Sequence, residues 1–162
     1  MICRSGKFQS PINIEPRLLL FDPKLRRMSI DVPDTVDGIF QNAGNNLILT
    51  LDDVIKFSAN FSDGPFMYTY RLAQVQIHLG KTNSVGSEHR IDGKAFSAEI
   101  HLVCYNSYLF KSLKEAISKP YGVAILAIFA EIAYGSEKIN SAFTVLADSA
   151  TKIPFHGKTV TG

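Results

Sequence analysis

Two short segments near the middle of the chain alternate polar and apolar residues, and this alternation restricts the fold more than any other feature. The segments are residues 74–80 (QVQIHLG) and residues 99–105 (EIHLVCY). Because successive side chains of a β-strand point to opposite faces of the sheet, a period of two predicts a strand with one polar and one apolar face. The predicted polar faces hold Gln74, Gln76, His78, Glu99 and His101.

The loop between these strands, residues 81–94, is rich in Gly, Ser and Asn. Such a loop lets the two strands lie close together in one sheet, with their polar faces on the same side. Two imidazoles, two amides and a carboxylate would then share one patch. Desolvating this patch costs free energy unless its groups are hydrogen-bonded, bind a metal or line a cavity.

Composition and length are those of a single domain. The chain has 162 residues, of which 46% are apolar, and this is enough for a sizeable core. A net charge of +2 with only short basic clusters argues against a nucleic-acid partner. The longest apolar run, residues 123–130, is far shorter than the ~20 residues that cross a bilayer, so we expect a buried strand and no membrane span.

The first residues lack a basic start followed by an apolar stretch, so no secretory signal is expected in this chain. The protein is then cytosolic, or the true start is missing. Cys104 falls on an apolar face and is interpreted as a small buried hydrophobe, whereas Cys3 could pair with a cysteine outside this chain. The sequon at Asn60 stands in a turn-like stretch, which predicts a surface loop with Asn60 as a candidate glycosylation position.

Most of the chain is predicted to form short strands separated by turns. One helix is expected after Ser112, because Ser112 and Glu115 have capping-box spacing and Pro120 stops the apolar stripe. Patterning weakens after Leu146, and residues 158–162 are not expected to form a closing element. The predicted strands are residues 30–32, 38–41, 47–51, 72–79, 98–105 and 123–133.

Several separate motifs, in the same order along the chain, resemble those of the α-carbonic anhydrases. They are residues 9–14 (QSPINI), 70–72 (YRL), 86–89 (GSEH) and 99–103 (EIHLV). The resemblance implies a mainly β (α+β) fold, with a central, mostly antiparallel, twisted sheet and short peripheral helices. Three further segments resemble in particular the carbonic anhydrase-related proteins of the X/XI type: residues 3–9 (CRSGKFQ), 20–23 (LFDP) and 95–97 (AFS).

In active members of that family three histidines bind zinc, and His78 and His101 match two of these positions. Gln76 occupies the third position. Three neutral imidazoles leave the full charge on zinc, which lowers the pKa of its bound water from 15.7 to about 7. A neutral amide oxygen is a weaker zinc ligand than an imidazole nitrogen. The resemblance implies that zinc is not bound at full occupancy: either it binds weakly, or both histidines are buried and hydrogen-bonded to Gln74, Gln76 and Glu99.

The surroundings of this metal site are matched at several further positions. Gln74 and Glu99 stand where the family hydrogen-bonds its ligating imidazoles, and such partners orient the rings and set their tautomers. Glu88 matches the glutamate that in active enzymes orients a threonine hydroxyl above the metal. His89 is expected to make hydrogen bonds rather than to bind metal.

Catalysis in the family needs further parts, and the resemblance implies that one of them is lost. Asn45 takes the place of the proton-shuttle histidine, and an amide cannot titrate near neutral pH. Val103 and Ile125 match hydrophobic positions in the wall of the substrate pocket, although ordinary core packing is the other interpretation.

Residues 1–162 match roughly the first two thirds of the family domain, so we expect a partial domain without its C-terminal part. That part would carry the threonine, the last strands and the cysteine expected to pair with Cys3. One functional hypothesis is a catalytically inactive domain that is secreted or displayed at the cell surface and binds a protein partner there, by resemblance a neuronal one. The alternative is a zinc-dependent carbonate dehydratase with weak or residual activity.

Overall fold

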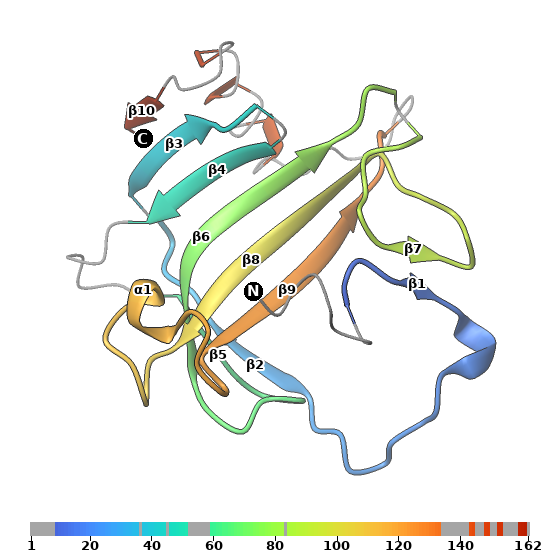
Figure 1. The fold of residues 1–162 in the computed structure, drawn as a ribbon, viewed down its shortest axis with the longest axis vertical. Coiled ribbons are helices and arrows are strands. Elements are labelled where there is room, and N and C mark those ends of the chain that lie inside the picture. Colours follow the sequence, from blue (N-terminus) through green and yellow to red (C-terminus); the bar gives the residue numbers. More distant parts are fainter. Residues whose placement is uncertain are drawn as a thin grey trace.

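Among the residues that the structure describes, eight strands form a twisted antiparallel sheet at the centre of the molecule (Figure 1). The computed structural model describes residues 9–35, 37–44, 46–51, 59–82, 84–133, 143–144, 148–149, 152–153 and 159–161. The strands of this sheet are β2 (Met28–Asp31), β3 (Gly38–Asn42), β4 (Asn46–Leu51), β5 (Asn60–Asp63), β6 (Tyr70–Leu79), β8 (Ala98–Asn106), β9 (Val123–Ala130) and β10 (Thr159–Thr161).

Strand β6 organises the sheet, because it pairs along both of its edges. One edge pairs with β5 near its start and with β4 further along, and the other edge pairs with β8 over nearly its whole length. The order continues outward from β4 to β3 and β10, from β5 to β2, and from β8 to β9. Strands β6 and β8 therefore lie side by side in the middle of the sheet, as Figure 1 shows.

One face of the central strands is apolar and buried. Ile77 of β6 and Ile100 of β8 lie opposite each other and pack with Phe40 of β3 and with Ile153. Val75 and Leu102 continue the same face, and the other face of both strands carries the polar residues. The alternation in the sequence thus corresponds to a core side and a polar side of one sheet.

A β-bulge in β6 changes the phase of its alternation. Leu72 lies opposite Cys104 and Gln74 opposite Val103, so one extra residue is inserted between them. Leu72 therefore shares the buried face with Val75, although the two are three positions apart in the sequence. All six predicted strands are present, and their observed ends differ from the predicted ones by no more than three residues.

Four strands were not predicted. β1 (Asn13–Ile14) pairs in parallel with β7 (Arg90–Ile91), apart from the main sheet. The sequon residue Asn60 lies in β5, opposite Asp31 and Arg71, so the prediction of a surface loop there was wrong. The expectation that residues 158–162 form no closing element was also wrong, because β10 pairs with β3. Both segments gain backbone hydrogen bonds from strands distant in sequence, which local composition does not reveal.

The predicted helix is present but is a single turn, α1 (Leu113–Ala116). The Ser112 hydroxyl accepts a hydrogen bond from the Glu115 backbone N–H at 3.3 Å, which caps the helix as expected. In a complete capping box the Glu115 carboxylate would accept a hydrogen bond from the Ser112 backbone N–H. Here it accepts from the Lys111 N–H instead, at 2.9 Å. A short 3-10 helix, η2 (Pro16–Leu18), lies near the start of the described chain.

Cys104 is fully buried in the apolar face, as predicted, and burial raises the pKa of its thiol to about 12. Because the thiolate is the reactive form, we expect no alkylation of Cys104 by iodoacetamide at about pH 8 in the folded chain. Mass spectrometry of a Cys3→Ser variant measures this, since Cys104 is then the single cysteine of the chain. The same variant in urea should react fully. Rapid labelling without denaturant would show that this face is not packed as described.

Candidate functional site

The polar faces of β6 and β8 meet in one patch. In the antiparallel register Gln76 lies opposite His101, and His78 lies opposite Glu99. Directly opposed residues point to the same side of a sheet, so the predicted gathering of these side chains is confirmed. The neighbouring strands complete the face: Asn46 of β4 lies beside His78, and Ala127 of β9 lies beside His101.

The loop between β6 and β8 lies against this patch, and close backbone contacts hold it there. A Cβ atom on Gly80 would lie 1.7 Å from the Val85 carbonyl oxygen, and one on Gly86 would lie 1.8 Å from the Ser97 carbonyl oxygen. Only glycine permits such approaches. The Ser87 hydroxyl accepts a hydrogen bond from the Phe96 N–H at 2.9 Å. These contacts position the two residues after Ser87, which are Glu88 and His89.

Glu99 is a fully buried carboxylate that accepts three hydrogen bonds. Its Oε1 lies 2.6 Å from Nδ1 of His89 and 2.7 Å from Nε2 of His101, and its Oε2 accepts from the His89 backbone N–H at 2.8 Å. Burial alone raises the pKa of Glu99, but the hydrogen bonds from His101 and His89 outweigh it and lower that pKa below its usual value. An ionised carboxylate only accepts hydrogen bonds, so both rings donate to it.

The hydrogen bond to Glu99 determines which ring nitrogen of His101 carries the proton. A neutral imidazole that donates from Nε2 carries its lone pair on Nδ1. In its neutral form His101 thus presents the lone pair of Nδ1 on the side away from Glu99. Carboxylates hydrogen-bonded to the histidine ligands of metals commonly have this effect. The side chains of His89, Glu99 and His101 are also close enough together to hold a metal ion. Their short hydrogen bonds already occupy these atoms, and His89 has the hydrogen-bonding contacts expected from the sequence.

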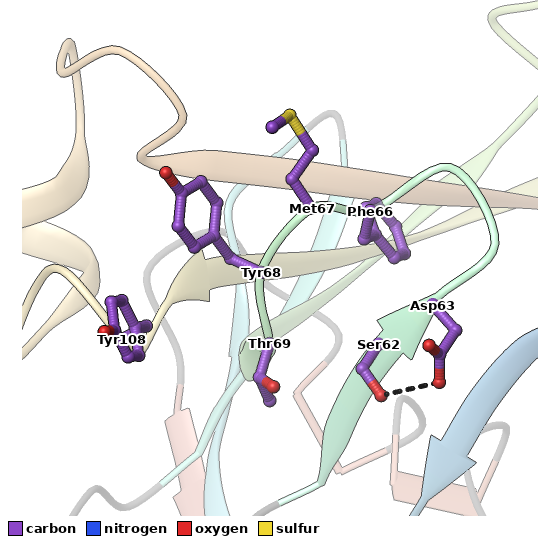
Figure 2. Close-up of a pocket in the computed structure, with 7 residues that line it drawn as sticks. All are labelled: Ser62, Asp63, Phe66, Met67, Tyr68, Thr69 and Tyr108. Atoms are coloured by element: carbon purple, nitrogen blue, oxygen red, sulfur yellow. Dashed lines mark hydrogen bonds between the residues drawn. The ribbon is translucent and has the colours of Figure 1, made fainter.

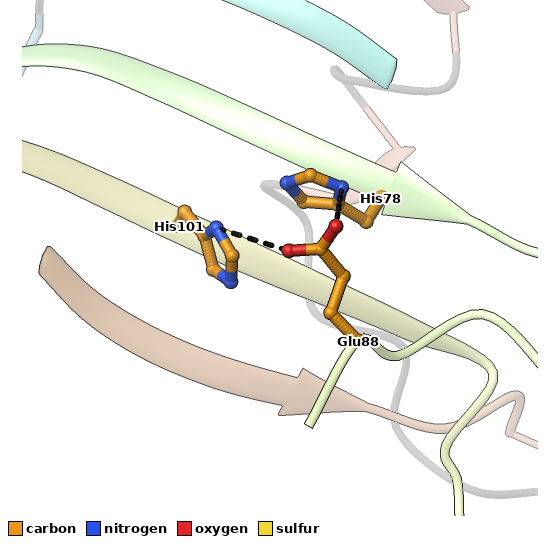
Figure 3. A group of neighbouring side chains, drawn as sticks. All are labelled: His78, Glu88 and His101. Atoms are coloured by element: carbon orange, nitrogen blue, oxygen red, sulfur yellow. Dashed lines mark ion pairs between the residues drawn. The ribbon is translucent and has the colours of Figure 1, made fainter. Parts of the chain in front are cut away.

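His78 has no comparable hydrogen bond. Its side chain is 15% exposed, and Nε2 is buried without a hydrogen-bond partner among the described residues. Burial lowers the pKa of His78 against the opposing attraction of Glu88, so the ring is neutral at pH 7. The rings of His78 and His101 are 4.5 Å apart between centroids. Figure 3 shows both rings with the Glu88 carboxylate, whose oxygens lie 3.5 Å from Nδ1 of His78 and 4.0 Å from Nδ1 of His101.

Gln76 and Gln74 interact with each other rather than with the imidazoles. The Gln76 amide Nε2 donates to Oε1 of Gln74 at 3.3 Å, and Nε2 of Gln74 donates to the Thr50 hydroxyl at 3.3 Å. In the described part of the chain His78 therefore receives no hydrogen bond from either amide. Both Gln74 and Glu99 were expected to orient the imidazoles at the two matched ligand positions. Glu99 is hydrogen-bonded to His101, whereas Gln74 is hydrogen-bonded to Thr50 and Gln76.

The remaining predicted site residues lie at the edges of the patch or outside the described residues. Val103 is buried and lies opposite Ile125 of β9, which is 56% exposed, on the same face as His101. Asn45 and Cys3 lie outside the described residues.

A separate concave region lies at the turn after β5. It encloses about 530 Å³ (Figure 2), and the ring of Tyr108 stacks near that of Tyr68 at 5.9 Å between centroids. Asp63 is the single carboxylate among the described residues that line this region. The lining therefore contains no pair of carboxylates that could act as acid and base. Its lining consists of Ser62, Asp63, Phe66, Met67, Tyr68, Thr69 and Tyr108.

Comparison with known proteins connects the patch to a family. The family model of eukaryotic-type carbonic anhydrases matches residues 1–162. The chain belongs to the eukaryotic-type carbonic anhydrases. This carbonic anhydrase-like chain is 35% identical to the human (Homo sapiens) "Carbonic anhydrase-related protein" over an alignment of 161 residues, and the alignment covers 97% of the chain and 53% of that relative.

Two further relatives show similar levels of identity. The "Carbonic anhydrase-related protein" of Rattus norvegicus is 34% identical over 97% of the chain and 53% of its own length. "Carbonic anhydrase 1" of Oryctolagus cuniculus is 32% identical over 91% of the chain and 62% of its own length. The chain thus spans between half and two thirds of these curated relatives.

The residues at the patch of this carbonic anhydrase-like domain fit a zinc ion in part. His101 presents a lone pair on Nδ1, and Nε2 of His78 is a buried nitrogen without a described partner. At the third position Gln76 supplies an amide that is hydrogen-bonded to Gln74. From the sequence, Glu88 was expected to orient a threonine hydroxyl above the metal. The position of its carboxylate near both imidazoles was not predicted. No local pattern could have revealed it, because the path of the loop decides it.

Proposed function

We propose that this chain is a catalytically inactive carbonic anhydrase-related domain whose zinc site is weakened by Gln76. The observation that supports it is the register of β6 and β8, in which Gln76 lies opposite His101 and beside His78 on one face. A third imidazole there would complete a three-histidine site. The amide at this place is neutral and makes its hydrogen bond to Gln74, so it contributes little to holding a cation.

The relatives support a carbonic anhydrase-like domain but do not discriminate between the two functions by identity. The chain is 35% identical to a protein named "Carbonic anhydrase-related protein" and 32% identical to one named "Carbonic anhydrase 1". The choice therefore depends on individual site residues. Asn45 favours inactivity alongside Gln76, since an amide at the shuttle position would not carry protons between the site and solvent.

We further propose that the domain acts as a protein-binding module, secreted or displayed at the cell surface, with a neuronal partner. The support is the resemblance of residues 3–9, 20–23 and 95–97 to the X/XI type of related proteins. Among the described residues, no helix combines the length and apolar character that a membrane crossing requires.

The alternative function is weak zinc-dependent hydration of carbon dioxide. The observation in its favour is the environment of His101, whose Nε2 donates to Glu99, a carboxylate that is itself hydrogen-bonded to His89. This leaves Nδ1 of a neutral His101 ring available for a metal. Such a carboxylate-histidine arrangement raises the basicity of a metal ligand.

Carbon dioxide hydration by the 162-residue chain separates the two functions. We expect that protein dialysed against metal-free buffer holds well under one equivalent of zinc, and that its hydration rate equals that of a chelator-treated control. Stopped-flow measurements with a pH indicator, with and without added zinc, provide the readout. Zinc-dependent turnover that a sulfonamide inhibits would contradict the proposal and favour the alternative.

A further inference from the structure

The carboxylate of Glu88 lies between the two imidazoles of the patch (Figure 3). Its oxygens are 3.5 Å from Nδ1 of His78 and 4.0 Å from Nδ1 of His101. Charge-assisted hydrogen bonds between nitrogen and oxygen are shorter, about 2.7–2.9 Å. Two ligands of a tetrahedral zinc ion, each ~2.0–2.1 Å from the metal, are separated by roughly 3.3 Å. The spacing is therefore closer to that of a ligand set than to that of a hydrogen-bonded cluster.

The donor atoms are in the states that a metal needs. Glu99 takes the Nε2 proton of His101 in a hydrogen bond, which leaves the Nδ1 lone pair facing Glu88. Neither nitrogen of His78 makes a hydrogen bond with a described residue: Nδ1 faces Glu88 at 3.5 Å, and Nε2 is buried. One ligand atom from each of His78, Glu88 and His101 can be chosen so that all three lie within 4.8 Å of one another.

We propose that Glu88 takes over the position of third ligand, so that His78, Glu88 and His101 form a two-histidine, one-carboxylate site for a divalent transition metal ion such as zinc. Two histidines and one glutamate form a known zinc ligand set, in which further positions stay open to water. A carboxylate also brings a negative charge that the Gln76 amide lacks. The site differs from a three-histidine site because its third donor is a carboxylate oxygen instead of an imidazole nitrogen. That oxygen comes from Glu88, in the loop between β6 and β8.

Glu88 is better suited to this role than Gln76. Its side chain is 44% exposed, so it can move by the few tenths of an ångström that coordination requires without disturbing packed neighbours. Gln76 would have to give up its hydrogen bond to Gln74 and would supply only a neutral oxygen. The proposal goes beyond the proposed function, because an ion can be held here whether or not carbon dioxide is hydrated.

Zinc titration of the 162-residue chain tests the site. We expect one saturable site of on the order of micromolar affinity in competition with a chromophoric chelator, weak enough to be stripped by dialysis. Glu88→Gln should weaken zinc binding by about tenfold or more, since even partners that only orient ligands contribute 10–100-fold. Gln76→Ala should leave the affinity unchanged within error. The control is Glu131→Gln, which removes an exposed carboxylate paired with Lys94 and should have no effect.

Other outcomes would overturn the proposal. They are the absence of saturable zinc binding, an unaltered affinity in Glu88→Gln, or a large loss in Gln76→Ala. Far-UV circular dichroism establishes that each variant is folded. X-ray absorption of the zinc-loaded unsubstituted chain gives an answer without any variant: we expect two imidazole ligands and additional oxygen ligands, and any other imidazole number would contradict the site. Hydration rates of the same samples are recorded separately, so failure of this site and failure of the proposed inactivity are distinct results.

Discussion

Replacing Gln76 with histidine is expected to raise the zinc affinity of this chain by at least about 100-fold, the upper end of the 10–100-fold that orienting partners alone contribute. The backbone position is already correct, since Gln76 lies opposite His101 and two residues before His78 on one face. A third imidazole would replace a neutral amide with a nitrogen ligand that zinc prefers. The chelator competition used for the unsubstituted chain measures the gain.

Gln74→His is the matched control for this variant. Gln74 lies on the same strand and the same face, but it is opposite Val103 and one step further from both histidines. We expect it to raise zinc affinity far less than Gln76→His. Equal gains would mean that any added imidazole binds zinc, and no gain at either position would mean that the site is lost beyond its missing ligand. Full hydration activity is not expected from Gln76→His, because Asn45 remains unable to transfer protons.

Replacing Glu99 with alanine is expected to lower the free energy of unfolding by about 3–5 kcal/mol, the usual effect of breaking a buried charged network by removing one partner. The truncation leaves the two ring donors of His89 and His101 and the backbone N–H of His89 without their acceptor. Each buried unsatisfied donor costs about 1–3 kcal/mol. Domains of this size are stable by only about 5–15 kcal/mol, so the variant should be near the limit of folding.

Urea unfolding followed by circular dichroism measures this effect. The matched control is Glu131→Ala, because the Glu131 side chain is 55% exposed and pairs with Lys94 at the surface. Exposed pairs of this kind contribute about 0–1 kcal/mol. A loss below about 1 kcal/mol for Glu99→Ala would show that water or another group replaces the carboxylate, and that the network around it is not essential to the fold.

The central strands could be predicted because their pattern is local. A period of two in residues 74–80 and 99–105 predicts both the strands and the sides to which their residues point. The predicted shared patch of Gln76, His78, Glu99 and His101 followed from that periodicity, and the register confirms it. Cys104 was placed on the buried face by the same reasoning.

Other elements could not be predicted because their stability comes from distant strands. Asn60 begins a strand only because Asp31 and Arg71 pair with it on either side. A segment rich in Ser, Asn, Asp and Gly otherwise indicates a turn, and the turn does follow directly, at Asp63 and Gly64 with positive φ. The strand at Thr159–Thr161 likewise depends on its partner β3.

At the polar patch, the sequence by itself determined the donor types and their faces: two imidazoles, a carboxylate and two glutamine amides. Only the tertiary structure decided what these groups contact. The loop held by Gly80 and Gly86 brings Glu88 to both imidazoles and His89 to Glu99. A strand's alternation is a property of neighbouring residues, whereas the path of a loop depends on backbone contacts that close only when the sheet has formed.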